Sequence, residues 1–472
     1  MSLNKDILSI EILPKKTKFA YGFGEFVHII LSNVAFAAIT FYYNVKLGLN
    51  EQLIGLAWLI FAFWNAINDP LFGFIQDRTK SKWGRRIPYI RFGAPIYGIL
   101  FILVWIPLVD ITNEIALFIY LLFILFTFDS IYTIIGLIMY SMPAEMVISS
   151  KARANLMIYG SIFSSLGFLV ALMLPVLLLT GSESTSVDPT FLIIMIIVGS
   201  VCALVLFICS FYLKENKYTQ LEEPMGMFES LKETFKNKPF LIFEVSIFCF
   251  ILAQTILTTA LFYYIDYILK LGGILALLPI LIFFAMVLGF TYTYSKLAAK
   301  HGLKKIYIFS LILSGLGFIL GFFIAWSLIP AILAFIIIGI GFSGIFLTQQ
   351  ALFAETIDYD EILTTKRRET SYSGVNALIT KPAISVANFL FLAIISFYGF
   401  QRTAQTQTEA AELGIMIGFM ILPALFILIS ALAIKFFPLD GAEWIQQKIE
   451  LKKTHDEKER AYLAYLKEQG VL

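Results

Sequence analysis

The chain has 472 residues, of which 59% are hydrophobic and 14% are charged, and its net charge is +2. Soluble domains carry about 25% charged residues, so a chain with this few charges and 46 Phe residues cannot cover itself with a water-soluble surface. The composition therefore excludes a soluble enzyme or binding module and predicts an integral membrane protein.

Apolar segments long enough to cross a membrane follow one another along the chain. A spanning helix needs about 20 apolar residues, and these segments are residues 19–43, 53–76, 88–109, 114–142, 156–180, 190–213, 239–269, 272–295, 305–326, 328–353, 372–399 and 412–437. Of the 35 Lys and Arg residues, all except Lys46, Lys270, Arg402 and Lys381 lie in or beside connections that face inside if both termini are cytoplasmic. This bias predicts that orientation and an even number of spans.

The longest inside connection divides the twelve spans into six and six. A weak repeat agrees with this division, because Glu145 after the fourth span and Glu355 after the tenth both follow an Ala and precede basic residues. Two similar six-helix halves describe the major facilitator architecture, with its substrate site between the halves near the midplane. We therefore expect an all-α polytopic membrane protein with two pseudo-symmetric bundles. Its expected parts are a cytoplasmic N-terminal tail (1–18), two six-helix bundles (19–213 and 239–437), a cytoplasmic central loop (214–238) and a cytoplasmic C-terminal tail (438–472).

The second apolar segment contains a carboxylate. A charge inside hydrocarbon costs at least about 2.5–3.5 kcal/mol, so Asp69 indicates a functional site. Asn65 lies four residues earlier on the same helical face, and Asn68 is adjacent. Pro70 has no N–H, so the carbonyl of Ala66 loses its helical partner. These oxygens suit Na⁺ or a proton, although an Asp held by local hydrogen bonds for packing is the structural alternative.

Two further spans carry an ionisable group near their middle. Asp129 and Thr133 lie four residues apart in the fourth span, where they either bind an ion or substrate or face a water cavity without a specific role. Lys381 stands alone in the eleventh span. A buried ammonium needs a carboxylate partner, and Asp69 or Asp129 across the central cavity would supply one. The alternative is a lysine that snorkels to the surface, which the ten or more residues on either side make difficult.

The first span contains Glu25 and His28, three residues apart. They could form a proton-sensitive pair, because His titrates near neutral pH. They also lie only two or three turns from the inner surface, where pairing with loop charges is ordinary.

The connection after the second span is charged at both ends, with Asp77-Arg78 at its start and Arg85-Arg86 at its end. We interpret it as a conformational latch at the inner surface.

The tail after residue 438 has charges of alternating sign. We expect it to contain a cytoplasmic helix with Trp444 and Ile445 on an apolar face.

The chain has no G-x-x-x-x-G-K-[ST] phosphate-binding pattern and no His/Glu metal motif. An ATP-driven pump is therefore unsupported, and we expect neither an enzyme nor a cofactor beyond a coupling ion, Na⁺ or H⁺.

Several short motifs resemble the glycoside–pentoside–hexuronide:cation symporter family, the melibiose-carrier type of major facilitator protein. The similarity extends over nearly the whole chain. It is carried by residues 21–24 (YGFG), 64–70 (WNAINDP), Gly73, 80–84 (KSKWG), 132–133 (YT), 354–359 (AETIDY) and Lys381.

The resemblance implies roles for four residues. Asp69 would be a cation ligand, and Asn65 stands where many members have a second carboxylate. Thr133 matches a hydroxyl near the cation site, and Lys381 matches a lysine that links the two halves.

The chain also departs from the family at the sugar-binding set. Ile29 stands where the melibiose carriers have a sugar-binding acid, Gly136 replaces a second acid of the fourth span, and Tyr140 replaces a stacking Trp. Ser161 lies near the position of an expected arginine. Asp129, two turns from Gly136 on about the same face, could take over part of the missing charge.

We thus expect a secondary active transporter that couples Na⁺ or H⁺ to the symport of an organic solute, by family precedent a sugar or glycoside. The alternatives are a lysolipid or amphiphile symporter of the same family and, from another class, a non-coupled lipid scramblase or sensor. The expected partners are a small-molecule solute and the bilayer, with no nucleic acid, in a monomeric, multi-pass protein of the cell membrane.

Overall fold

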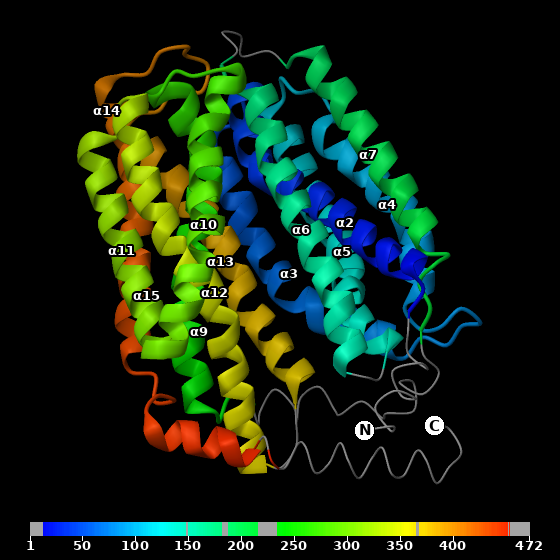
Figure 1. The fold of residues 1–472 in the computed structure, drawn as a ribbon. Coiled ribbons are helices and arrows are strands. Elements are labelled where there is room, and N and C mark those ends of the chain that lie inside the picture. The colour runs from blue at the N-terminus through cyan, green and yellow to red at the C-terminus, as the bar shows by residue number, and fades with distance from the viewer. Residues whose placement is uncertain are drawn as a thin grey trace.

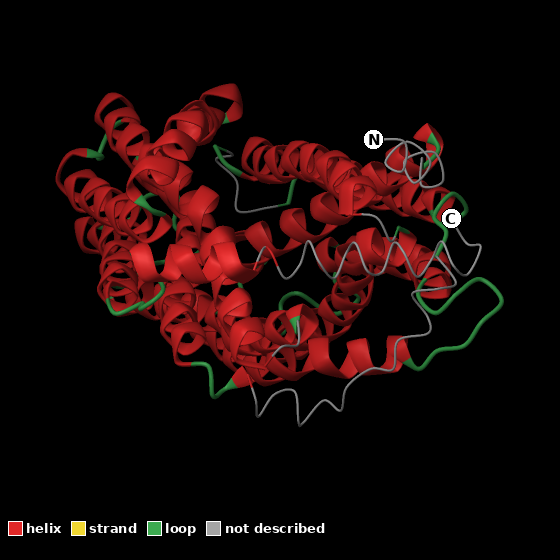
Figure 2. Cartoon of the chain, turned by 60° about the horizontal axis from the view of Figure 1, so that its bottom comes forward, coloured by secondary structure: helices red, strands yellow, loops and turns green. Residues whose placement is uncertain are grey.

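The structure, a computed structural model, describes residues 13–147, 150–181, 187–215, 234–364, 368–451 and 453. Most of the expected N-terminal tail, the central loop from 216 to 233 and the tail beyond 453 lie outside the described residues. Within the described residues the chain is helical, with loops at the connections (Figure 2).

The N-terminal group of helices contains six membrane-length elements (Figure 1). They are α2 (Lys15–Phe41) with its continuation η1 (Tyr42–Lys46), α3 (Glu51–Asp77), α4 (Ile87–Trp105), α5 (Glu114–Met146), α6 (Ser150–Leu179) and α7 (Pro189–Cys209).

The C-terminal group also contains six. They are α9 (Lys238–Tyr263) with η3 (Tyr264–Ile268), η4 (Gly273–Leu277) with α10 (Leu278–His301), α11 (Leu303–Ile324), α12 (Leu328–Thr364), α13 (Glu369–Phe397), and α14 (Glu409–Met416) with η5 (Ile417–Ile421) and α15 (Leu422–Lys435).

The sequence determines where these helices begin. The first turn of a helix has backbone N–H groups without helical acceptors, and side chains just before the helix accept from them. These N-cap residues are Asn50, Asn113, Asp188, Asn237 and Thr408. One turn needs a glycine: Gly302, with φ of 91°, lets α10 end and α11 begin within a single residue.

The twelve predicted spans are confirmed among the described residues. The largest difference is the length of the tenth span, since α12 runs on to Thr364. The fourth span also continues past its predicted end, because α5 runs to Met146. Glu145 and Glu355 therefore lie within helices rather than after them. Both carboxylates have basic partners at this end of the bundle, which explains why the helices extend past their apolar stretch.

The outer surface of the bundle is apolar. Phe63 and Phe397, for example, are 80% and 85% exposed. A soluble protein would not leave such side chains in water, whereas a hydrocarbon environment accepts them. The twelve helices and this surface describe a multi-pass membrane protein.

The two groups meet along their central helices. Helix α3 of the N-terminal group packs lengthwise against α13 of the C-terminal group, and α2 touches α9. Below the C-terminal group, residues 442–451 form a further helix that lies across the lower end of the bundle in Figure 1. In this helix Trp444 is buried against the ring of Tyr359, while Ile445 is 59% exposed.

Candidate functional site

Lys381 lies at the centre of a polar cluster between the two groups. Its ammonium forms an ion pair with Asp69 on α3. It also donates to Asn68 Oδ1 on α3 at 3.2 Å and to Thr133 Oγ1 on α5 at 3.0 Å. One C-terminal side chain thereby holds two helices of the N-terminal group. Of the two carboxylate partners that the sequence allowed for Lys381, the structure selects Asp69.

Asn68 connects this ion pair to the second carboxylate. Its amide nitrogen donates to Asp129 Oδ2, and also to Thr133 Oγ1 at 3.1 Å. Asn68, Asp129 and Thr133 are at most 3% exposed. The cluster contains two carboxylates and one ammonium. The amide of Asn68 lies between Asp129 and the Lys381–Asp69 ion pair.

Asn65 makes a different contact from the one its spacing indicates. Its amide nitrogen donates to the backbone carbonyl of Lys381 at 3.2 Å, and its Oδ1 is buried without a hydrogen-bond partner among the described residues. Asn65 therefore joins α3 to α13 through the backbone and keeps one free oxygen beside the cluster.

Both helices that supply the ion pair have a proline directly after the charged residue, Pro70 in α3 and Pro382 in α13. Proline removes a backbone N–H, so the carbonyl four residues earlier loses its helical donor. The sequence predicted this for Pro70, and α13 repeats it on the other side of the cluster.

The structure does not bring Glu25 and His28 together as a pair. Glu25 accepts from Ser164 on α6 at 3.3 Å. His28 is buried and stacks on Tyr132, with ring centroids 5.3 Å apart. A Cβ placed on Gly136 would lie 3.2 Å from His28 Nε2, so the imidazole fills the space that a larger residue at position 136 would need.

Tyr140 lies further along α5 and is 72% exposed. Its hydroxyl is 3.4 Å from Ser373 Oγ on α13. The tyrosine thus points across the interface between the two groups, outside the cluster around Lys381.

The predicted latch at the lower end of Figure 1 is an ion-pair network, which we call the basic-end network. Arg85 and Arg86 both contact Glu145 on α5, the second at 3.1 Å, and Arg86 also pairs with Asp77 at 3.1 Å. Burial alone would lower the pKa of Arg85, but hydrogen bonding to Glu145 raises it above its usual range. Arg78 is not part of these pairs, because it lies over the ring of Phe74, 3.8 Å from its centroid.

Sequence reasoning missed two acceptors of this network. Glu145 was noted only as part of a repeat. Glu215 accepts the backbone N–H groups of Arg85, Arg86 and Ile87 at 2.8, 2.8 and 3.0 Å. The position of Glu145 close after the fourth span is a sequence signal for an ion-pair acceptor. Glu215 binds backbone N–H groups, and such a contact has no signal in the sequence.

Further contacts between the two groups lie at the opposite end, where α14 lies at the top of Figure 1. Arg402 pairs with Glu114, and with Glu51 at 3.9 Å. The backbone N–H of Gly181 donates to Asp266 at 2.7 Å. Gly181 and Gly272 touch so closely that a Cβ on either would overlap the other. Sequence reasoning did not find these contacts, which depend on how loops of separate halves meet.

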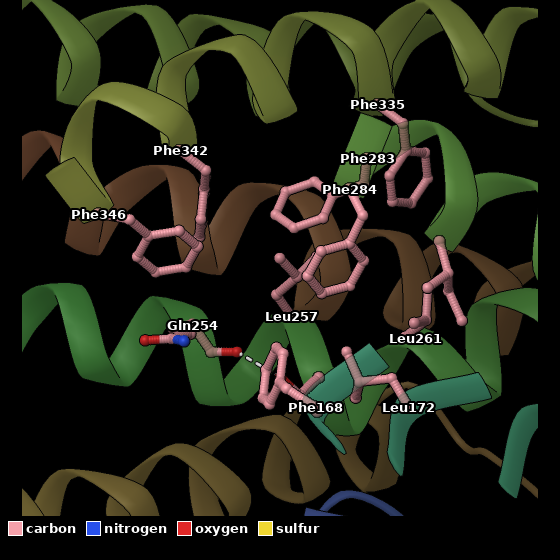
Figure 3. A pocket seen from close by; sticks show the side chains of 12 residues that line it. Phe168, Leu172, Gln254, Leu257, Leu261, Phe283, Phe284, Phe335, Phe342 and Phe346 are labelled. Atoms are coloured by element: carbon pink, nitrogen blue, oxygen red, sulfur yellow. Dashed lines mark hydrogen bonds between the residues drawn. The ribbon is translucent and has the colours of Figure 1, made fainter. Parts of the chain in front are cut away.

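A pocket lies between α6 of the N-terminal group and α9, α10 and α12 of the C-terminal group (Figure 3). Its wall is almost wholly apolar and contains Phe168, Leu172, Leu257, Leu261, Ile280, Phe283, Phe284, Phe335, Phe342 and Phe346. Thr258 donates to the backbone carbonyl of Gln254 at 2.9 Å, so the side chain of Gln254 is the polar group left in the wall.

Comparison with known proteins agrees with this geometry. The model of a family described as "MFS/sugar transport protein" matches residues 20–441. The "Uncharacterized symporter YnaJ" of Bacillus subtilis (strain 168) is 24% identical over 98% of this chain and 99% of its own. The "Glucuronide carrier protein homolog" of Escherichia coli (strain K12) is 23% identical over 93% of this chain and 96% of its own.

Solved structures show the same fold. A D-xylose-proton symporter has a TM-score of 0.63 and 14% identity, covering 90% of this chain and 98% of its own. The nucleoside transporter NupG has a TM-score of 0.60 and 14% identity, covering 89% of this chain and 100% of its own.

Proposed function

Because the chain belongs to the MFS/sugar transport family, we propose that it is a secondary active transporter that couples the symport of a sugar or glycoside to Na⁺ or H⁺. The family consists of transporters and not of enzymes. Relatives over the full length are named symporters, and one is named a glucuronide carrier homologue. The substrate class and the coupling to a cation rest on these names and on the cluster at the centre of the fold.

The observation that carries the proposal is the ion pair between Lys381 and Asp69, which joins the two groups within their membrane-length helices. A charge there is expensive unless it is paired. A cation bound at Asp69 would compete with Lys381 for the carboxylate and would weaken the link between the halves. Binding of the ion is thereby tied to movement of the halves, which is what coupling requires.

The other candidate residues take their roles from this centre. Asp69, Thr133 and Asn65 would bind the cation, with the free oxygen of Asn65 as a further ligand. Asp129, Tyr140, Glu25 and His28 are the substrate-binding or coupling candidates.

We also propose an orientation and a conformational state. The bias of Lys and Arg supports placing the basic-end network and both termini in the cytoplasm. The contacts of Arg402 and of Gly181 with Asp266 then close the outer side, while Arg85, Arg86 and Glu145 pair within one half on the inner side. This state would be inward-facing, with residues 19–213 and 239–437 as the two halves that rock in a monomer.

The test uses purified protein in liposomes with radiolabelled xylose, methyl glucoside, methyl glucuronide and sulfoquinovose under imposed Na⁺ or H⁺ gradients. The wild type should accumulate at least one sugar, and Asp69→Asn should equilibrate that sugar without accumulating it. Lys381→Ala should change the dependence on cation concentration. Undiminished accumulation by Asp69→Asn would overturn its role as cation ligand, and lipid flipping without a gradient would identify a scramblase instead.

One observation favours a second candidate, an amphiphilic substrate. The apolar pocket of Figure 3 lies between the two groups and offers several Phe rings and a single side-chain amide. An alkyl or aryl chain fits this lining better than a bare sugar does. Competition of sugar uptake by octyl glucoside below its micellar concentration, compared with methyl glucoside, would reveal such a preference. Phe283→Ala should reduce it, and equal competition by the two glycosides would exclude it.

A further inference from the structure

The central cluster leaves one of its two carboxylates without a positive partner. A lysine ammonium has three N–H donors. In this structure they go to Asp69, to Asn68 Oδ1 and to Thr133 Oγ1. None remains for Asp129, which receives the amide of Asn68 instead.

Asp129 is also removed from water, since the residue is 1% exposed. A buried carboxylate that faces only neutral donors is strongly disfavoured as an anion. With both carboxylates ionised the cluster would carry one excess negative charge. One proton or one monovalent cation at Asp129 restores neutrality.

Among the residues that the structure describes, the groups neighbouring Asp129 supply no positive charge other than Lys381. Asp69 on α3 is paired, and Tyr97 on α4 and Tyr132 on α5 are neutral phenols beside Asp129. His28 on α2 is stacked on the ring of Tyr132, with ring centroids 5.3 Å apart. The described ionisable residues of α6, Arg153 and Tyr159, lie in its first ten residues, toward the basic-end network.

The oxygens around Asp129 are arranged for a proton rather than a metal ion. Asn68 turns its N–H toward Asp129 and its oxygen toward Lys381. Thr133 Oγ1 already accepts from both Asn68 and Lys381, so both of its lone pairs are occupied. Na⁺ needs several free oxygens, whereas a proton needs only the carboxylate.

We infer that Asp129 carries the coupling proton of this transporter, and that Asn68 links its protonation to the Lys381–Asp69 pair. The inference rests on the proposed function, which it deepens by naming H⁺ as the coupling ion. The proton then binds Asp129, and Asp69 acts as the partner of Lys381 rather than as a cation ligand. A proton from water on one side binds the Asp129 carboxylate, and Lys381 is then committed to Asp69, as in this structure. Release of that proton to the other side restores the second negative charge, which draws Lys381 away from Asp69 and loosens the link between the halves.

The inference can be tested without a known substrate. Infrared difference spectra of the purified protein between alkaline and acidic buffer report the C=O stretch of a protonated carboxylic acid. We expect Asp129→Asn to lose the band. Asp69→Asn should keep the band with a lower pH midpoint, because Lys381 is then available to pair with Asp129. Survival of the band in Asp129→Asn would overturn the inference and leave cation coupling intact.

Two further arms keep the test decisive if Asp129→Asn does not fold. Asn68→Leu removes the donor that stabilises the charged carboxylate, so the pH midpoint of the band should rise by about one unit; an unchanged midpoint would contradict the inference. Stabilisation of the wild type against thermal unfolding by NaCl over choline chloride, lost in Asp129→Glu, would identify a Na⁺ site instead. Failure of the wild type to accumulate any sugar would count against the proposed function alone, because the infrared band does not depend on transport.

Discussion

Glu145 and Glu355 hold matching places in the two groups but bind different segments. Each lies near the end of a long helix, α5 or α12, and each is buried, at 5% and 7% exposure. Glu145 takes two arginines from the connection between α3 and α4. Glu355 takes Lys448 at 2.8 Å, from the helix of residues 442–451. The repeat places a glutamate at the same position in both groups. The basic partner of each glutamate comes from a different segment of the chain.

Because Glu145 and Glu355 have different partners, their ion pairs stabilise different parts of the molecule. The basic-end network belongs to the six-helix group itself, and Glu215 ties the same connection to the start of the central segment. The helix with Lys448 is an appendage that docks on the end of α12. The contacts of Glu145 should therefore stabilise the fold of the N-terminal group, whereas the pair of Glu355 and Lys448 should hold one peripheral helix.

The largest effect is expected at Glu145. Glu145→Gln removes the charge that two arginines share, and their side chains are only 17% and 11% exposed. Breaking a buried ion pair costs several kcal/mol, and partial exposure of the arginines reduces this to about 2 kcal/mol. Thermal unfolding in detergent should show a lower midpoint, with loss of transport in liposomes.

Glu443 offers a matched control at the same end, because its side chain is exposed. Glu443→Gln should leave the midpoint unchanged. Equal destabilisation by the two substitutions would mean that the basic-end network acts through overall charge rather than through these contacts.

A smaller effect is expected from Trp444→Ala. Trp444 is 5% exposed and lies against Tyr359, with ring centroids 6.2 Å apart. Truncating a buried Trp in a core costs about 3–5 kcal/mol, but a terminal helix can detach instead of leaving a cavity, which limits the loss to the free energy of docking. We expect faster tryptic cleavage at Lys448 with an unchanged midpoint for the bundle.

Ile445→Ala is the control for this prediction, because Ile445 is next to Trp444 in the chain but is 59% exposed. It should be cleaved at the wild-type rate. Faster cleavage of both variants would show that the helix docks through its whole apolar surface.

The sequence predicted the twelve spans because bilayer thickness sets the length of an apolar segment, and Asp69 and Lys381 because a lone charge in such a segment stands out. It predicted that Lys381 would pair with either Asp69 or Asp129, because few partners exist in hydrocarbon, and it left the choice between them open. It did not predict the exclusion of Arg78, the separation of Glu25 from His28 or the role of Asn68. Those depend on side-chain directions set by packing, which spacing along one helix does not determine. The contacts of Arg402 join loops of different groups and have no local signature.

The smallest effect, and the sharpest comparison, is the coupling between Glu355 and Lys448. The side chain of Lys448 is 37% exposed and that of Glu355 is 9% exposed, so solvent screens the ion pair. A double-mutant cycle with Glu355→Gln and Lys448→Met, measured by the rate of chymotryptic cleavage after Trp444, should give about 0.5–1 kcal/mol at low salt. The coupling should fall toward zero in 1 M salt, where charges are screened beyond about 3 Å. A coupling as large as the effect of Glu145→Gln, and insensitive to salt, would show that the two glutamates do equivalent work in the two groups despite their different partners.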